Sequence, residues 1–236
     1  MPGYDSYVKA LLHMNGDDAS QTFVDETGKA VTAGGTAQID TAQKVFGTGS
    51  CLLDGNSDYV SLLASDDWYL SNGNWTIDFW VRFNNVGTQT GLFHQYADAQ
   101  NYLTCYFGGS PIDQLNILFR DANTERFQYG YVWSPSVNTW YHLEFVRNGT
   151  SLLLFQAGVL KSWTYSTTAI GSNVLGNIAA PLEIGRGQQP GDTVRYTNGW
   201  IDEFRWSKGV ARHTADFSVP TEEYALETFR QQAIII

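Results

Sequence analysis

Short stretches in which apolar and polar residues alternate, separated by Gly, Asn, Asp and Ser, run through most of this chain. Alternation with a period of two is typical of half-buried β-strands, whose successive side chains point to opposite faces. In residues 76–83, this pattern predicts that Ile77, Phe79 and Val81 face a core and that Asp78 faces away from it. Helical periodicity is almost absent, so we predict an all-β fold.

The same alternation predicts about a dozen strands. Strands are expected over 7–14, 51–55, 59–62, 76–83, 101–107, 115–120, 126–133, 140–147, 151–156, 181–186 and 199–206. Asn148 and Gly149 predict a hairpin between 140–147 and 151–156. No helix is long enough to connect parallel strands, which indicates an antiparallel two-sheet sandwich of the jelly-roll type. We expect one domain over residues 1–224, followed by a C-terminal tail over 225–236.

Composition limits the partners and the location of this protein. The chain has a net charge of −10 and no block of Lys and Arg, which argues against nucleic acid and against anionic membranes as partners. Its apolar runs are shorter than the ~20 residues of a membrane-spanning helix, and its first residues do not read as a signal peptide. The two cysteines, Cys51 and Cys105, predict either one disulfide or, as we favour, two thiols in the core.

The end of the chain is apolar. It closes on Ile234, Ile235 and Ile236, a terminus that we expect to dock on another surface. That surface is either its own domain, a sheet edge of a second copy in a homo-oligomer, or a larger assembly such as a virion.

Five blocks of the sequence, taken in order, resemble one family. They are 11–29, 37–62, 74–83, 140–158 and 199–224. They resemble the laminin-G-like group of the concanavalin A-like lectin and glucanase superfamily, and the resemblance spans residues 6–224. It implies a sandwich whose sheet or rim loops bind glycans or proteins, often with calcium, in modules of bacteriophage virion and bacterial surface proteins. The chain departs from the family at Ala157, where Asp or Asn usually precedes Gly.

Two neighbouring carboxylates, Asp202 and Glu203, are the first candidates for catalysis. Adjacent residues on a regular strand point to opposite faces, whereas the two acids of a glycosidase must face one cleft. The E-x-D-x-x-E pattern that the superfamily's glucanases carry is also absent. We therefore expect no catalytic residues and no enzyme.

Acidic loops raise the alternative of a structural calcium ion. Calcium takes six to eight oxygen ligands, and the loops around Asp18, Asp25 and Asp54 supply carboxylates. The resemblance implies that such an ion lies where the first loop meets the final strand, which adds Asp202. These loops are equally consistent with simple turns, because Asp, Asn and Gly favour turns for backbone reasons.

Aromatic residues on the middle strands are the candidates for sugar binding, because sugars stack their C–H faces on aromatic rings. In 126–133 the residues Phe127, Tyr129, Tyr131 and Trp133 share one face, which is either a core stripe or a binding platform. We favour packing for Phe127 and Tyr129, and keep Tyr131 and Trp133 as ligand candidates. The remaining candidates, expected to line the same sheet, are Tyr102, Tyr106, His94, Arg120 and Arg186, with Tyr96 beside them.

Two functions from different classes remain. The first is a non-catalytic carbohydrate-binding or adhesion module, with a glycan or polysaccharide as ligand, on a virion or at a cell surface. The second is a structural or decoration protein of a capsid or tail, whose fold mediates assembly without binding glycans.

Overall fold

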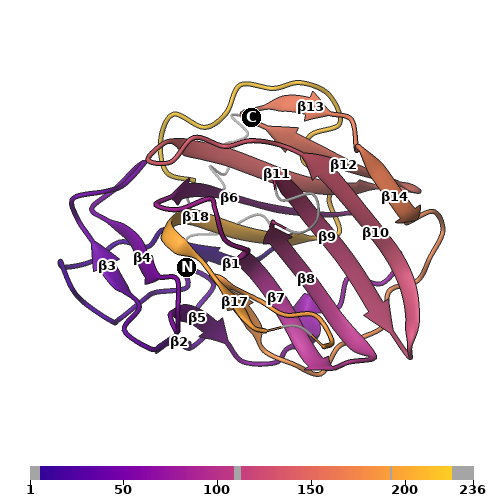
Figure 1. Ribbon diagram of the computed structural model, residues 1–236, viewed down its shortest axis with the longest axis horizontal. Helices are drawn as coiled ribbons and strands as arrows, with labels where there is room; N and C mark the ends of the chain where they lie inside the picture. The colour runs from indigo at the N-terminus through magenta and orange to yellow at the C-terminus, as the bar shows by residue number, and fades with distance from the viewer. Residues whose placement is uncertain (1–5, 109–112, 192, 225–236) are drawn as a thin grey trace, which may run out of the picture.

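Two antiparallel β-sheets of eight strands each pack face to face (Figure 1) in a computed structural model that describes residues 6–108, 113–191 and 193–224. Sheet A consists, in spatial order, of β13 (Val159–Lys161), β12 (Ser151–Gln156), β11 (Trp140–Asn148), β6 (Trp75–Phe83), β18 (Asn198–Lys208), β4 (Ser50–Asp54) and β3 (Gln38–Asp40), and β1 (Val8–Leu12) pairs with β18. The prediction of an antiparallel jelly-roll sandwich is confirmed.

Sheet B is the second layer. It consists, in order, of β14 (Tyr165–Thr168), β10 (Thr124–Val132), β9 (Gln114–Asp121), β8 (Asn101–Phe107), β7 (Thr90–Asp98), β15 (Leu182–Ile184), β5 (Tyr59–Leu62) and β2 (Val31–Gly34). A small hairpin of β16 (Arg186–Gly187) and β17 (Arg195–Tyr196) lies against β7, and η1 (Asp66–Trp68) is a single 3-10 turn. No helix in the part of the chain described is long and apolar enough to cross a membrane.

Strand β7 is the longest element that the sequence pattern did not predict. Its register with β8 shifts between Gly91 and Phe93, so Leu92 and Phe93 are both buried although they are adjacent. A bulge adds one residue to the strand and interrupts the period of two. Alternation alone therefore missed β7, whereas the Asn148–Gly149 hairpin between β11 and β12 is confirmed.

The core between the sheets is built on packed phenylalanine rings. The ring of Phe79 stacks on those of Phe145 and Phe204 at 6.5 and 5.8 Å, and Phe93 of sheet B meets Phe79 edge to face at 5.9 Å. Both cysteines are free thiols in this core, as favoured above, and burial raises the pKa of each.

The aromatic row of 126–133 is a core stripe. Phe127, Tyr129 and Trp133 are buried among the core residues, and Tyr131 packs against them with its hydroxyl 3.3 Å from a side-chain oxygen of Gln156. Tyr131 and Trp133, which were kept as ligand candidates, therefore face the core and do not form a binding platform. The inner face of sheet B requires large side chains to fill the space to sheet A, and this row supplies them.

The prediction that Asp202 and Glu203 point to opposite faces is wrong. The register of β18 against β6 shifts between Asp202 and Arg205, and Glu203 has a φ of 52°. Ile201 and Phe204 both enter the core, so the two acids between them lie on the outer face of sheet A. The bulge reverses an orientation that a regular strand would have imposed.

The outer face of sheet A is closed by the segment that follows β18, residues 209–224. The Phe217 ring stacks on His213 at 3.6 Å, His213 contacts Glu144 at 3.0 Å, and the Tyr224 hydroxyl donates to Asp78. Both of these acids are fully buried as a result. Residues 225–236, for which docking was predicted, lie outside the described residues.

Ala157 stands at a position where its backbone is strained. Gln156 pairs with Val159, which leaves Ala157 and Gly158 as a two-residue turn with φ values of 51° and 75°. Such turns favour Asn-Gly because Asn tolerates the left-handed conformation that costs other residues about 1–2 kcal/mol. We expect Ala157→Asn to raise the free energy of unfolding by about 1 kcal/mol in urea titrations. Ala157→Val should lower it, and an equal effect of both changes would contradict the strain.

Candidate functional site

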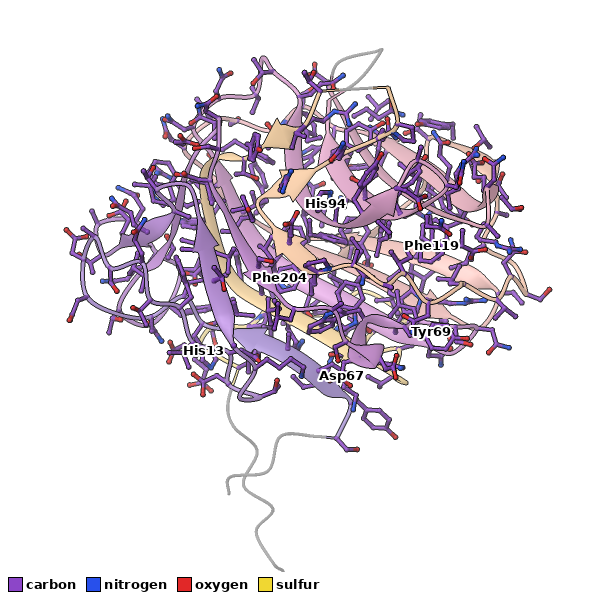
Figure 2. The ribbon with its side chains drawn as sticks, turned by 90° about the horizontal axis from the view of Figure 1, so that it is seen from below. His13, Asp67, Tyr69, His94, Phe119 and Phe204 are labelled. Carbon is purple, nitrogen blue, oxygen red and sulfur yellow. The ribbon has the colours of Figure 1, made fainter. Side chains whose placement is uncertain are left out.

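The outer face of sheet B is not covered by a following segment as sheet A is, although Tyr102, Thr104, Tyr106 and Leu118 on it are buried against their neighbours. In Figure 1 the strands β8, β9 and β10 lie at the front and no other described segment crosses them. Figure 2 places His94, on this face, and His13, beside sheet A, on opposite sides of the core residue Phe204. Binding groups on this face must come from the residues that alternate with the core positions.

Aromatic rings occupy the middle of this face. Tyr102, Tyr106 and Leu118 form a second apolar cluster, separate from the core, and the half-buried Tyr96 packs against it. The rings of Tyr96 and Tyr102 lie 5.8 Å apart. Leu118 lies between the tyrosines because β8 and β9 pair with Leu118 opposite Thr104. Tyr102 and Tyr106 are only 5% and 7% exposed, so Tyr96 is the ring of this cluster on which a sugar can stack.

A charged group lies beside the rings on β7, β15 and β16. His94 Nε2 is hydrogen-bonded to Glu183 Oε2, and Arg186 Nη1 donates to the same oxygen at 3.0 Å. Burial opposes the charge of Glu183, but the bond from His94 and the charge of Arg186 lower its pKa. Glu183 is therefore an ionised acceptor at neutral pH, held in place by two donors.

The β16–β17 hairpin brings basic and aromatic side chains to one end of the same face. The guanidinium of Arg186 lies 4.9 Å from the ring centroid of Tyr59 and 5.7 Å from that of Tyr196, and the guanidinium of Arg195 lies 4.3 Å from that of Tyr106. The hairpin comes this close because β7 has a glycine at position 91: a Cβ there would lie 2.0 Å from the backbone nitrogen of Gly187. Stacking on the tyrosines orients both arginines.

Five of the seven predicted ligand residues come together here. They are Tyr102, Tyr106, His94, Arg120 and Arg186. Arg120, on β9 opposite Tyr102, donates to the side chain of Asn123 at 2.9 Å. Glu183 was not predicted as a site residue, although it is the polar residue between Leu182 and Ile184 in a predicted strand. Tyr59, Tyr196 and Arg195 were not predicted either, because only the tertiary structure brings them to this face.

The four predicted calcium ligands lie in separate hydrogen-bond sets. Asp25 accepts from the amide of Leu11 at 2.8 Å, Asp18 from Thr41 at 3.1 Å, and Asp54 from Asn56 at 2.8 Å. Asp202 accepts from the amide of Val45 at 2.7 Å. No three of these carboxylates offer oxygens within 4.8 Å of one another. They therefore do not form a cluster of carboxylates, and calcium binding at these loops stays a prediction.

Two other groups of acidic and histidine side chains do converge within the described residues. They are His13 with Glu203 and Glu223, and Asp78 with His142 and Glu144. In the first, His13 Nδ1 lies 2.7 Å from Glu203 Oε1. In the second, Arg205 and Tyr224 already donate to Asp78. The first group therefore holds His13, at the start of the first loop, to sheet A. The second holds the segment 209–224 to sheet A.

Comparison with known proteins gives one family match and a set of similar folds. A family model described as concanavalin A-like lectin/glucanases superfamily matches residues 54–214, about two thirds of the chain. The search of curated protein sequences found no match.

Among solved structures, domain 4 of the extracellular GH43 arabinanase AbnA from Geobacillus stearothermophilus, in complex with arabinotriose, is similar. It has a TM-score of 0.61 and 19% identity, over 86% of this chain and 93% of that one. A structure of botulinum neurotoxin type C is also similar, with a TM-score of 0.61 and 14% identity over 86% of this chain and 49% of that one; cell entry of that toxin depends on interaction with two ganglioside molecules. The binding domain of botulinum neurotoxin serotype D has a TM-score of 0.59 and 14% identity, over 94% and 50%. At these identities the likeness concerns the fold.

Proposed function

This chain belongs to the concanavalin A-like lectin/glucanase superfamily, and on that basis we propose that it is a non-catalytic carbohydrate-binding module whose ligand lies on the outer face of sheet B. One observation carries the proposal. On that face, the half-buried Tyr96, backed by Tyr102, lies beside the hydrogen-bonded group of His94, Glu183 and Arg186. A sugar needs both an aromatic surface for its C–H face and oriented polar groups for its hydroxyls.

The similar structures support the class of ligand. The arabinanase domain is a complex with arabinotriose, and the type C toxin interacts with gangliosides, so two proteins with this fold bind glycans. The present chain shares the fold with them and has its own set of side chains on sheet B. The ligand class is thus a proposal that rests on these side chains.

We propose an extracellular, cell-surface or virion location for the module, in keeping with its resemblance to such proteins. A role as a structural capsid or tail protein is the competing function. It predicts that no glycan binds and that assembly depends on protein contacts, including those of residues 225–236.

Tyr96→Ala should weaken glycan binding about tenfold or more, because stacking of a sugar on this ring is lost. A glycan array with the fluorescently labelled protein identifies the ligand, and isothermal titration calorimetry then measures its affinity for wild type and variant. Tyr96→Phe keeps the ring and should bind within about threefold of wild type.

Tyr7→Ala is the matched control, since Tyr7 is an exposed tyrosine that precedes β1 of sheet A. It should leave affinity unchanged. Absence of binding to every glycan on the array would refute the proposed function and favour the structural role.

A further inference from the structure

The Glu183–Arg186 pair leaves one acceptor and one donor side by side at the surface. Glu183 Oε2 accepts hydrogen bonds from both His94 and Arg186, whereas within the described residues Oε1 has one long contact, 3.3 Å from Arg186 Nη1. The side chains of Glu183 and Arg186 are 14% and 22% exposed. A ligand can therefore reach an unfilled carboxylate lone pair together with guanidinium N–H groups other than that of the buried Nε.

Buried polar atoms that have no hydrogen-bond partner in the described part of the chain gather around this pair. They are His94 Nδ1, Thr104 Oγ1 and Arg186 Nε. His94 and Thr104 are direct neighbours across β7 and β8, and His94 faces Glu183 across β7 and β15. Buried polar groups are nearly always hydrogen-bonded in folded proteins, so this concentration points to a polar partner on the same face.

The charges of the pair restrict what that partner can be. Glu183 and Arg186 neutralise each other at 3.0 Å, so a ligand carboxylate would meet the charge of Glu183 and a ligand amine that of Arg186. Hydroxyl groups carry no charge and can both donate and accept. Two neighbouring hydroxyls match the site, one donating to Glu183 Oε1 and the other accepting from Arg186.

We propose that Glu183 and Arg186 recognise a pair of adjacent hydroxyl groups on a neutral sugar, and that His94 is a positioning residue that holds Glu183 in place. This inference rests on the proposed function and names its ligand class. It assigns the sugar's orientation as well: its hydroxyl edge lies toward β15 and β16, and its C–H face lies on Tyr96.

The test compares binding of a neutral and an acidic trisaccharide of similar size, arabinotriose and trigalacturonic acid, together with every glycan that the array identifies. Calorimetry should show that neutral glycans bind with an affinity that stays within about twofold between 50 and 500 mM NaCl, because the ligand carries no charge for salt to screen. Glu183→Gln and Arg186→Met should each weaken binding about 10- to 100-fold, the loss for a hydrogen bond to a charged group.

Matched controls come from residues of the same chemistry elsewhere. Glu222 is exposed in the segment that covers sheet A, and Arg82 of sheet A lies 4.7 Å from the Trp200 ring, so Glu222→Gln and Arg82→Met should not change affinity. His94→Leu should weaken binding, and His94→Gln, which keeps a donor toward Glu183, should restore most of it. A merely structural His94 would lower the melting temperature without this rescue.

The outcomes separate the inference from the function that it extends. If only acidic glycans bind, or if Glu183→Gln and Arg186→Met bind like wild type while Tyr96→Ala is weak, the inference is overturned and the proposed function stands. If no glycan binds, both fail.

Discussion

Arg205→Met should lower the free energy of unfolding by about 3–5 kcal/mol, because it leaves the Asp78 carboxylate buried without its cation. Arg205 donates to both oxygens of Asp78, from Nε at 3.0 Å and from Nη2 at 2.8 Å. Asp78 is fully buried under residues 209–224. Burial opposes its ionisation, but Arg205 and His142 together hold its pKa well below the ordinary range.

Urea titrations of wild type and variant from pH 7 down to pH 4 test this expectation. A carboxylate with a lowered pKa contributes stability above its unfolded pKa of about 3.9, and this contribution is lost only as pH falls through the folded pKa. Wild type should therefore keep the contribution of Asp78 over the whole range. In Arg205→Met the unpaired Asp78 takes up a proton more readily, so the deficit should shrink toward pH 4.

The double variant Asp78→Asn/Arg205→Met should recover part of the loss, because it removes the uncompensated charge as well. Arg82→Met, in which the arginine stacks on Trp200, is the control and should cost about 1 kcal/mol or less. A deficit below about 1 kcal/mol for Arg205→Met at pH 7 would show that the pair is no more than a surface contact.

Stability should also fall as pH rises from about 4 to about 7, through Asp202. Burial raises the pKa of Asp202 to about 7. The charge of Glu203 adds to this effect, and hydrogen bonds from the amides of Val45 and Phe46 oppose it. Between about 3.9 and 7 the folded state therefore binds a proton that the unfolded chain has released. The free energy of unfolding should decrease across this window by up to about 4 kcal/mol, at about 1.4 kcal/mol per pH unit.

Asp202→Asn should flatten this dependence, since the amide does not titrate. The measurement is the free energy of unfolding of both proteins at half-unit intervals from pH 4 to pH 8. His13 titrates at higher pH: burial opposes its charge, but its bond to Glu203 raises its pKa above 6.5. The stability that His13 contributes is therefore lost only above about pH 6.5, outside the window from pH 4 to pH 6. A slope that Asp202→Asn leaves intact between pH 4 and pH 6 would assign the effect to another group.

Much of the fold follows from local patterns in the sequence. Alternation placed Leu103, Cys105 and Phe107 in the core and Tyr102 and Tyr106 on the opposite face, as observed. This works because successive side chains of a regular strand must point to opposite sides. The candidate site was predictable to the same extent, since Tyr102, Tyr106, His94, Arg120 and Arg186 all reach one face of sheet B.

Local patterns did not predict the bulges or the contacts between distant segments. One extra residue at Asp202 and Glu203 turns both acids to the same side, and no local signal marks it. Tyr131 and Trp133 share a face with Phe127, but whether that face is inside depends on sheet A packing against it.

The sequence by itself determined that this protein is an antiparallel sandwich and which residues share a strand face, because both follow from periodicity and turn chemistry. Only the tertiary structure decided which sheet face is covered by another segment. Residues 209–224 cover sheet A, and the β16–β17 hairpin brings Arg186 to Glu183 and His94. These contacts join segments far apart in the chain, and their geometry is set by packing of the whole molecule.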